Sequence, residues 1–335
     1  MKRIITFGEI MMRLSPPTNE RFGQARHLEV VYGGSEANVS LALAQWGWPC
    51  AHVSALPDHA FGQAVGQYLR QHGVDTQYLC YTNGRLGLYF LEKGAALRGS
   101  QVIYDRYHSA LAQIEKYSFD WENILHQAQW FHWTGITPAL SENCAYELRR
   151  AMAIAQKLGV PVSGDVYFRS GLWQYGASPQ EVLPELIALS QVVVCDEKAM
   201  QAYFGLAPEV CRASFAEAAQ NLMAQFPSLQ KVLDTQRVSL SATCNRISAR
   251  MWNGNTYLET LPLEINPIID RVGAGDAFMA GFLHATLSGQ SDAEALHFGI
   301  CASAWKHTIP GDMLLASVEE IKSLQAGDTS GTLKR

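Results

Sequence analysis

The feature that most constrains the fold is a regular alternation of short apolar runs and helical segments through the middle of the chain. Runs rich in β-branched and aromatic residues recur at 129–133, 161–165, 191–195 and 231–234. Between the first two, residues 142–158 form a strong helical pattern that ends before Gly159, a common residue after a helix. Strands that alternate with helices imply βαβ units. The sequence therefore predicts an α/β fold with a central, mostly parallel sheet covered by helices on both faces.

A second, smaller sheet is predicted nearer the amino terminus. Residues 84–94 and 101–106 alternate polar and apolar side chains around a Gly-containing turn, which is typical of an antiparallel hairpin. Together with residues 10–32, they predict a small β lid, built from about 10–32 and 85–107, beside the main sheet.

The length of 335 residues allows either two domains or one large α/β domain with an appendage. The pattern favours one domain over residues 1–335, with the lid as the appendage. The polar tail at 325–335 is predicted to be frayed.

Composition excludes several classes of protein. Hydrophobic residues make up 48% of the chain and charged residues 17%, which is typical of a folded protein. A net charge of −5 gives no reason to expect a nucleic acid partner. No apolar run is long enough to cross a membrane, and the first residues lack a secretory signal, so we expect a cytoplasmic protein. The seven cysteines are scattered without a Cys-x-x-Cys pair, so neither disulfides nor a zinc site is favoured.

The segment Gly273-Ala274-Gly275-Asp276 carries the clearest chemical pattern, because it precedes a helical run of small and apolar residues. Free N–H groups in the first turn of a helix attract anions. Asp276 would repel a phosphate, so its presence favours a second role, in which it takes a proton from an attacking hydroxyl. From these four residues alone, an ordinary turn into a helix remains an alternative.

Other polar residues also follow predicted strands. Gly34 and Asn38 lie where a ligand could approach a helix entry, and 165–169 and 234–237 follow two strands of the main sheet. Ligands of parallel sheets bind beyond the carboxyl ends of the strands, so one crevice could collect these segments with Gly273 to Asp276. Arg169 offers a planar fork suited to a carboxylate or a phosphate.

With Asp270 before it and the small-residue helix after it, the glycine motif resembles the C-terminal signature of the PfkB (ribokinase-like) carbohydrate kinases. Within that family, five more segments resemble the 2-keto-3-deoxygluconate kinases. Residues 33–38 are similar to their Gly-Gly-Ala-Glu-Ala-Asn stretch, and 164–173 to their Asp-x-Asn-x-Arg-x-x-Leu-Trp segment. The lid strands and residues 306–312 are also similar. The resemblance covers nearly the whole chain in order.

The resemblance implies ATP-dependent phosphorylation of the terminal hydroxyl of a 2-keto-3-deoxy sugar acid, with Asp276 as the base. The backbone of Gly273, Ala274 and Gly275 would form an anion hole for the transferring phosphoryl group. The residues implied for the sugar acid are Gly34, Asn38, Tyr89, Tyr104, Arg106, Arg169 and Asp312. Those implied for the nucleotide are Thr235, Arg237, Gly273, Gly275 and Lys306.

Ions and assembly are also implied by the resemblance. Mg²⁺ would arrive with ATP and water rather than through direct protein ligands, with Glu197 as one candidate contact. A K⁺ ion is left open. The lid is expected to pair with its copy in a homo-oligomer, although edge strands can also stand alone.

Three segments depart from the family pattern. Cys195-Asp196-Glu197-Lys198 replaces the usual Asn-x-x-Glu that organises hydrated Mg²⁺, Tyr167 replaces an asparagine, and residues 235–245 are more polar and irregular than a usual nucleotide loop. Two alternatives therefore stay open: a kinase of a neutral sugar such as fructose or ribose, and a sugar-acid-binding regulator with weakened catalysis. Arg106 and Arg169 argue against the neutral sugar, because a buried unpaired guanidinium is costly.

Overall fold

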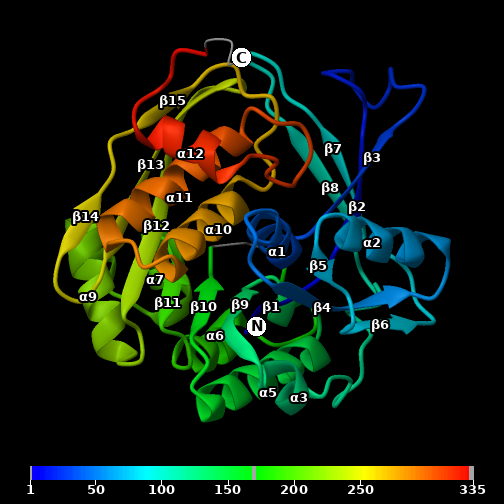
Figure 1. Cartoon of the computed structure of the whole chain (residues 1–335), viewed down its shortest axis with the longest axis horizontal. Helices are drawn as coiled ribbons and strands as arrows, with labels where there is room; N and C mark the ends of the chain where they lie inside the picture. Colours follow the sequence, from blue (N-terminus) through cyan, green and yellow to red (C-terminus); the bar gives the residue numbers. More distant parts are fainter. Residues whose placement is uncertain (1, 168–170, 332–335) are drawn as a thin grey trace.

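A computed structural model describes residues 2–167 and 171–331, and it contains a large main sheet. Its strands are β1 (Arg3–Phe7), β4 (Cys50–Pro57), β5 (Val74–Asp75), β6 (Leu79–Thr82), β9 (Ala128–Thr134), β10 (Val162–Asp165), β11 (Val192–Val194), β12 (Lys231–Ser241), β13 (Cys244–Trp252), β14 (Tyr257–Glu259) and β15 (Leu263–Ile265). They lie in the order β14-β13-β12-β11-β10-β9-β1-β4-β5, with β15 beside β13 and β6 beside β4 (Figure 1). From β12 to β5, each strand in this order runs parallel to the next one.

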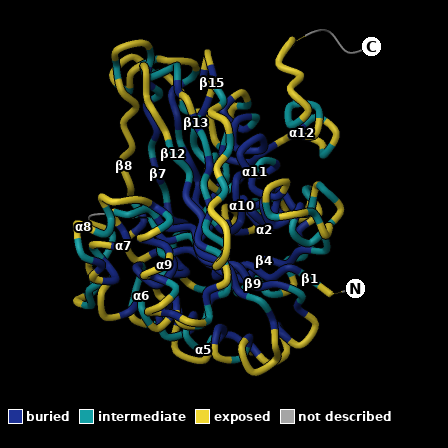
Figure 2. Tube along the Cα trace, turned by 90° about the vertical axis from the view of Figure 1, so that its left-hand side faces the viewer, coloured by how far each residue is buried: buried dark blue, intermediate teal, exposed yellow. Residues whose placement is uncertain are grey.

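Helices cover both faces of this sheet. One layer packs on alternate residues such as Ile5 and Phe7, and consists of α3 (Trp121–Leu125), α5 (Glu142–Leu158), α6 (Pro179–Ile187), α7 (Glu197–Phe204) and α9 (Phe215–Gln225). The other packs on residues such as Ile4 and Trp130, and consists of α1 (Ser35–Gln45), α10 (Ala274–Leu287), α11 (Asp292–Lys306) and α12 (Val318–Gln325). Figure 2 shows the central strands as the buried interior between the two layers. The predicted mostly parallel sheet covered on both faces is confirmed.

Three shorter or peripheral helices complete the fold. They are α2 (Ala60–Gln71), α4 (Thr137–Leu140) and α8 (Pro208–Ala213). Helix α2 packs beside α1 through Val65 and Leu69, which are buried with Leu41 of α1 and Met12. This cluster joins the amino-terminal helices to the second sheet.

The second sheet is small and lies beside the main body. Its strands are β2 (Met11–Ser15), β3 (Glu29–Gly33), β7 (Leu88–Glu92) and β8 (Gln101–Asp105), in the order β3-β2-β7-β8. Strands β7 and β8 form an antiparallel hairpin, and its turn reaches the β12–β13 turn, where the Ala242 N–H donates to the Ala96 carbonyl at 2.8 Å. The sheet thus extends from α1 to the far edge of the main sheet (Figure 1). That it acts as a lid stays a prediction.

The edge of the main sheet differs from the sequence-based expectation. The sequence predicts an irregular polar segment at 235–245, but β12 continues to Ser241 and pairs antiparallel with β13. The prediction was wrong because residues 237–240 are exposed at this end of the hairpin, the apolar Val238 and Leu240 included, so the strand has no buried face here. Strands β13, β14 and β15 form an antiparallel border that the strand-helix pattern did not indicate.

The carboxyl-terminal residues are described as far as Gly331. Beyond α12, the Asp328 N–H donates to the Ser323 carbonyl at 3.0 Å, and the Ser323 hydroxyl donates to the Asp328 carboxylate at 3.0 Å. This part of the tail, predicted to be frayed, is therefore hydrogen-bonded to the end of α12. In the described ranges, no helix has the length and apolar character needed to cross a bilayer.

Candidate active site

The glycine motif forms a tight turn into α10, as the sequence predicts. Gly273 is the residue before the helix and has φ of 82°, a left-handed conformation that favours glycine. A Cβ atom at this position would lie 1.9 Å from the Asp312 carbonyl oxygen, so no other residue fits. Asp276 follows in the first turn of α10, where the Ala274 N–H donates to the Arg271 carbonyl at a long 3.3 Å. Backbone N–H groups at a helix start and a carboxylate thus lie within one helical turn.

Helix α1 holds the carboxylate of Asp276. The Ser35 hydroxyl donates to Asp276 Oδ1 at 2.5 Å, and the Asn38 amide donates to Asp276 Oδ2 at 2.7 Å. The structure therefore brings Asn38 to the predicted base. The backbone of Glu9 packs directly against Gly34, where a Cβ atom would lie 1.9 Å from the Glu9 carbonyl oxygen. Sequence reasoning missed Ser35, although its place between Gly34 and Asn38 in a helix entry was a usable signal.

A buried ionic cluster joins the small sheet to the loop before the glycine motif. Arg13 of β2 donates to Asp270 Oδ2 at 2.5 Å and to Asp312 Oδ1 at 2.8 Å, and its side chain is 1% exposed. Tyr89 of β7 donates to Asp312 Oδ2. Burial opposes the charge of Arg13, but the two carboxylates outweigh it and raise its pKa above the ordinary value. Tyr89 and Asp312, predicted as sugar contacts, lie together here, and Asp312 is the common partner of Arg13 and Tyr89.

The sequence carried one signal for this cluster. Arg13 is the charged residue within the apolar run Ile10 to Leu14, and a buried charge requires a partner. The identity of that partner was not accessible, because Asp270 and Asp312 lie 257 and 299 residues further along the chain.

Arg106 also has a carboxylate partner. Its Nε and Nη2 donate to Glu9 Oε2 at 2.8 and 2.5 Å, and both side chains are buried. The argument that Arg106 would be unpaired beside a neutral sugar is therefore wrong for this residue, because Glu9 balances its charge. Tyr104 is half-exposed on β8, with its ring centroid 5.9 Å from that of Tyr89. Arg169 lies outside the described residues.

Thr235 and Arg237, predicted to contact the nucleotide, both lie on β12. Thr235 Oγ1 shares a hydrogen bond of 2.7 Å with the Tyr167 hydroxyl, so the tyrosine that replaces the family's asparagine connects the segment after β10 to β12. Arg237 is exposed. Burial, and after it the charge of Arg237, lowers the pKa of Arg271, while the charge of Asp270 opposes this change. Arg271 donates to the Ala242 carbonyl at 2.6 Å.

Lys306 lies behind the motif rather than in an open crevice. Its side chain is fully buried, and Nζ donates to the carbonyl oxygens of Asp270 at 3.3 Å and Ile309 at 3.0 Å. Burial lowers its pKa to about 8. In this conformation Lys306 supports the loop, and direct contact with a nucleotide requires a rearrangement. Its role as a nucleotide contact stays a prediction.

The segment that departs from the usual metal motif begins α7. The Asp196 carboxylate accepts from the Ala199 N–H at 2.8 Å, which caps the helix. Glu197 accepts from Arg250 at 2.5 Å, and Arg250 also donates to Asp234 at 2.7 Å. Burial raises the pKa of Asp234 to about 6 in spite of this pair. No cluster of His, Cys, Asp and Glu suited to a metal ion occurs within 2–167 and 171–331.

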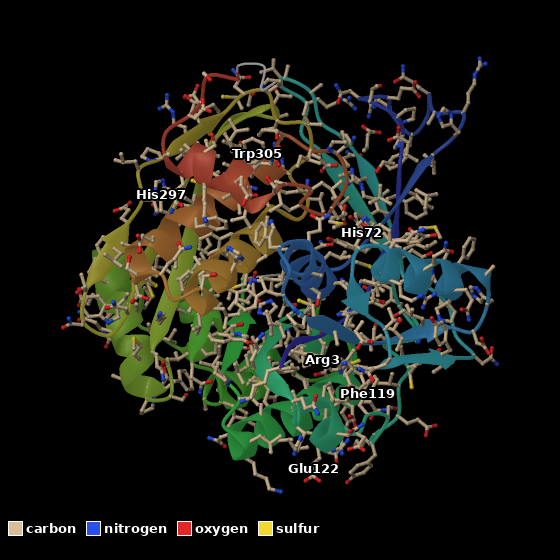
Figure 3. The ribbon with its side chains drawn as sticks, in the orientation of Figure 1. Arg3, His72, Phe119, Glu122, His297 and Trp305 are labelled. Carbon is tan, nitrogen blue, oxygen red and sulfur yellow. The ribbon has the colours of Figure 1, made fainter. Side chains whose placement is uncertain are left out.

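An apolar hollow of about 1010 Å³ lies where the segment around β15 meets the ends of α11 and α12. It is lined by Ile265, Ile269, Ala304, Trp305, Thr308 and Leu324, among others. Trp305 is labelled on α11 in Figure 3, beside α12. Ile269 connects this lining to the segment that leads into the glycine motif.

Comparisons with known proteins agree over nearly the full length. A family model described as pfkB family carbohydrate kinase matches residues 1–316. The chain is 32% identical over 332 residues to a 2-dehydro-3-deoxygalactonokinase of Haloferax volcanii, covering 98% of each. It is 27% identical to a 2-dehydro-3-deoxygluconokinase of Thermoproteus tenax, covering 93% of this chain and 90% of that one. A crystal structure of a 2-dehydro-3-deoxygluconokinase from Thermotoga maritima is 38% identical, with a TM-score of 0.93 and coverage of 98% and 100%.

Proposed function

The chain belongs to the pfkB family of carbohydrate kinases, as the resemblance of its motifs implied, and from this premise we propose that it phosphorylates a 2-keto-3-deoxy sugar acid. The phosphate donor is ATP, and the acceptor is the terminal hydroxyl of the sugar acid. The observation that carries the proposal is Asp276, placed in the first turn of α10 beside the Gly273–Gly275 amides and oriented by two residues of α1.

In the proposed reaction, the sugar hydroxyl lies against Asp276 and faces the γ-phosphorus. As the new O–P bond forms, Asp276 takes the hydroxyl proton, and the bond from phosphorus to the bridging oxygen of ADP breaks. The backbone N–H groups of residues 273–275 stabilise the charge on the transferring group. Helix α1 contributes by holding the carboxylate in place, so that proton acceptance does not require it to reorient.

At the nucleotide end, charge and shape support ATP. Arg237 and Arg271, whose charges act on each other, would bind phosphate oxygens. The apolar hollow lined by Ile269 and Trp305 would take the purine base. Mg²⁺ neutralises phosphate charge when it is bound with ATP. Because Arg250 already occupies Glu197, we expect the ion to be held through phosphate oxygens and water.

At the sugar end, Arg169 is the residue that would select the acid. Arg169 is proposed to meet the carboxylate, with Tyr104 covering the ligand from the small sheet. Replacing Arg169 with alanine should weaken acid substrates by about 1.5–3 kcal/mol, the range for a charge-assisted hydrogen bond. An equal loss on neutral sugars would remove Arg169 from carboxylate recognition.

The test is ADP release from ATP and Mg²⁺ over a panel of acceptors. The panel contains 2-keto-3-deoxygluconate, its galactonate epimer, fructose, ribose and a blank without sugar. Turnover confined to the keto acids supports the proposal, and their ratio assigns the epimer. Turnover on fructose or ribose alone would still identify a sugar kinase, but it would contradict the proposed sugar-acid substrate. No turnover, together with thermal stabilisation by a keto acid, would indicate a binding protein.

The Asp276→Asn variant tests the base. It should lose turnover by about two to four orders of magnitude, the contribution of a general base, while sugar-acid binding measured by calorimetry changes little. The matched control is Asp292→Asn, a carboxylate that pairs with Lys231 at 2.5 Å and lies at the start of α11. Near-normal turnover in Asp276→Asn would exclude the proposed role.

A neutral-sugar kinase is the second candidate, and one observation favours it. Because Glu9 balances the charge of Arg106, this arginine does not require an acidic ligand. Turnover on fructose or ribose in the same panel would distinguish this candidate from the sugar-acid kinase.

We also propose that the small sheet pairs with a second copy of the chain. Val30 on β3 and Ile103 on β8 are each more than half exposed and lie in one register row across the sheet, with Leu14 and Phe90 between them. Exposed apolar residues on the edge strands of an open sheet are typical of an interface. Light scattering should show a dimer or larger assembly, and Ile103→Lys should shift it towards the monomer.

A further inference from the structure

The hydroxyl of Ser35 makes a short contact with the proposed base. Ser35 is the first residue of α1, and its Oγ lies 2.5 Å from Asp276 Oδ1, while Asn38 holds Oδ2 from the next turn of the same helix. The family stretch that residues 33–38 resemble has alanine in this place. An alanine there would leave the helix intact and remove the contact.

We propose that Ser35 is a positioning residue that holds the Asp276 carboxylate in the orientation in which it accepts the proton of the sugar hydroxyl. The proposal rests on the kinase function proposed above. Ser35 acts through Asp276 and does not itself contact the reacting atoms.

The two donors on Asp276 differ in what they can do after proton transfer. The Asn38 amide nitrogen carries only hydrogens, so it can donate to Oδ2 but cannot accept. The Ser35 hydroxyl can rotate and act as either donor or acceptor. When Asp276 becomes protonated, Oδ1 can therefore donate its new proton to Ser35 without losing the contact. This asymmetry assigns Oδ1 as the oxygen that receives the proton.

The same contact sets how readily Asp276 is protonated. A hydrogen bond donated to a carboxylate favours its charged form, and the effect is largest when the contact is short and partly shielded from water. Other charges also face this carboxylate: buried Glu36 on α1 and buried Lys306 at the end of α11, besides the N–H groups that begin α10. None of these changes when the hydroxyl of Ser35 is removed.

The experiment compares the full-length protein with Ser35→Ala and Ser35→Thr. In wild type, kcat/KM should fall at acidic pH as Asp276 becomes protonated. Ser35→Ala should move this acidic limb upward by about one pH unit and lower kcat about tenfold, the scale of one hydrogen bond to a charged group. The KM for ATP should not change. Ser35→Thr, which keeps the hydroxyl, should restore both the limb and kcat.

The matched control is Ser40→Ala. Ser40 lies on the same helix, but its hydroxyl bonds to Thr6 Oγ1 at 3.0 Å, away from Asp276. This variant should leave the acidic limb in place even if stability falls. An unchanged limb in Ser35→Ala with kcat within twofold of wild type would overturn the proposal, as would equal losses in Ser35→Ala and Ser35→Thr.

A second measurement separates this proposal from the proposed function. The carboxyl carbon of Asp276 can be titrated by NMR in the protein without substrates, in wild type and in Ser35→Ala. An upward shift of the Asp276 pKa in the variant supports the contact even if no sugar on the panel turns over. Identical titrations in an active kinase would overturn the role of Ser35 alone.

Discussion

Two groups of arginines differ in what balances their charge. Arg13 and Arg106, in and beside the small sheet, are buried and bonded to carboxylates. Within the described part of the chain, neither Arg237 nor Arg271 has a carboxylate within ion-pair distance, and Arg271 donates to the Ala242 carbonyl instead. The first group therefore joins segments of the protein, whereas the second is the group that we propose to bind an anion.

The largest expected effect comes from breaking a paired arginine. Arg13→Met leaves the buried carboxylates of Asp270 and Asp312 without their cation, and should lower the free energy of unfolding by about 3–5 kcal/mol. Urea denaturation at neutral pH measures this loss. The control is Arg246→Met, which removes an exposed pair with Glu264 and should cost under about 1 kcal/mol. Equal losses in the two variants would mean that pairing at Arg13 contributes no more than a surface contact.

Glu36 tests the same comparison for a buried carboxylate whose partners are hydroxyl groups rather than a cation. Glu36 accepts hydrogen bonds from Thr134 and Thr137 at 2.8 and 2.7 Å, and burial raises its pKa from 4.5 to about 7. Between these values the unfolded chain ionises while the folded protein keeps the proton. Stability should therefore fall as pH rises through this window, by about 3 kcal/mol in total, and stay low above it.

The Glu36→Gln variant should remove that fall, because glutamine does not ionise. Urea denaturation of both proteins at pH 5 and pH 8 gives the comparison. Equal losses in wild type and Glu36→Gln between the two pH values would contradict the prediction. They would mean that the hydroxyl partners stabilise the ionised carboxylate of Glu36 as well as water does in the unfolded chain.

The smallest effect is expected for an arginine without a carboxylate partner. Arg237→Ala should raise the KM for ATP about tenfold, or about 1.4 kcal/mol, and the difference from wild type should shrink as salt is added. Stability should change by less than about 0.5 kcal/mol, because the side chain is exposed. Arg246→Ala, on the paired strand of the same hairpin, is the matched control. A large loss of stability in Arg237→Ala would place it with the structural arginines.

Local patterns predicted those parts of the molecule whose chemistry is contained in a few neighbouring residues. Gly273 to Asp276 could be interpreted from the sequence because a turn, a helix start and a carboxylate follow one another directly. The alternation of strands and helices was equally local, and it gave the parallel sheet. Helix 142–158 has the bounds that its pattern and Gly159 predict.

The remaining features depend on contacts between distant segments. Nothing near Arg106 indicates that Glu9 is its partner, and nothing near Asp276 indicates that Ser35 lies 241 residues away in sequence but 2.5 Å away in space. The β12–β13 hairpin was missed for a different reason. Its outer half is exposed, and the alternating Val238 and Leu240 there do not mark a buried face.

The cluster around Arg13 has a consequence for attempts to exchange parts between related kinases. The small sheet is made from two separate stretches, 11–33 and 88–105, and only the first carries the cation. Its anions, Asp270 and Asp312, belong to the recipient body. A graft that replaces the sheet but brings a neutral residue in place of Arg13 would bury two uncompensated negative charges. A chimera should therefore take Arg13, Asp270 and Asp312 from the same parent protein.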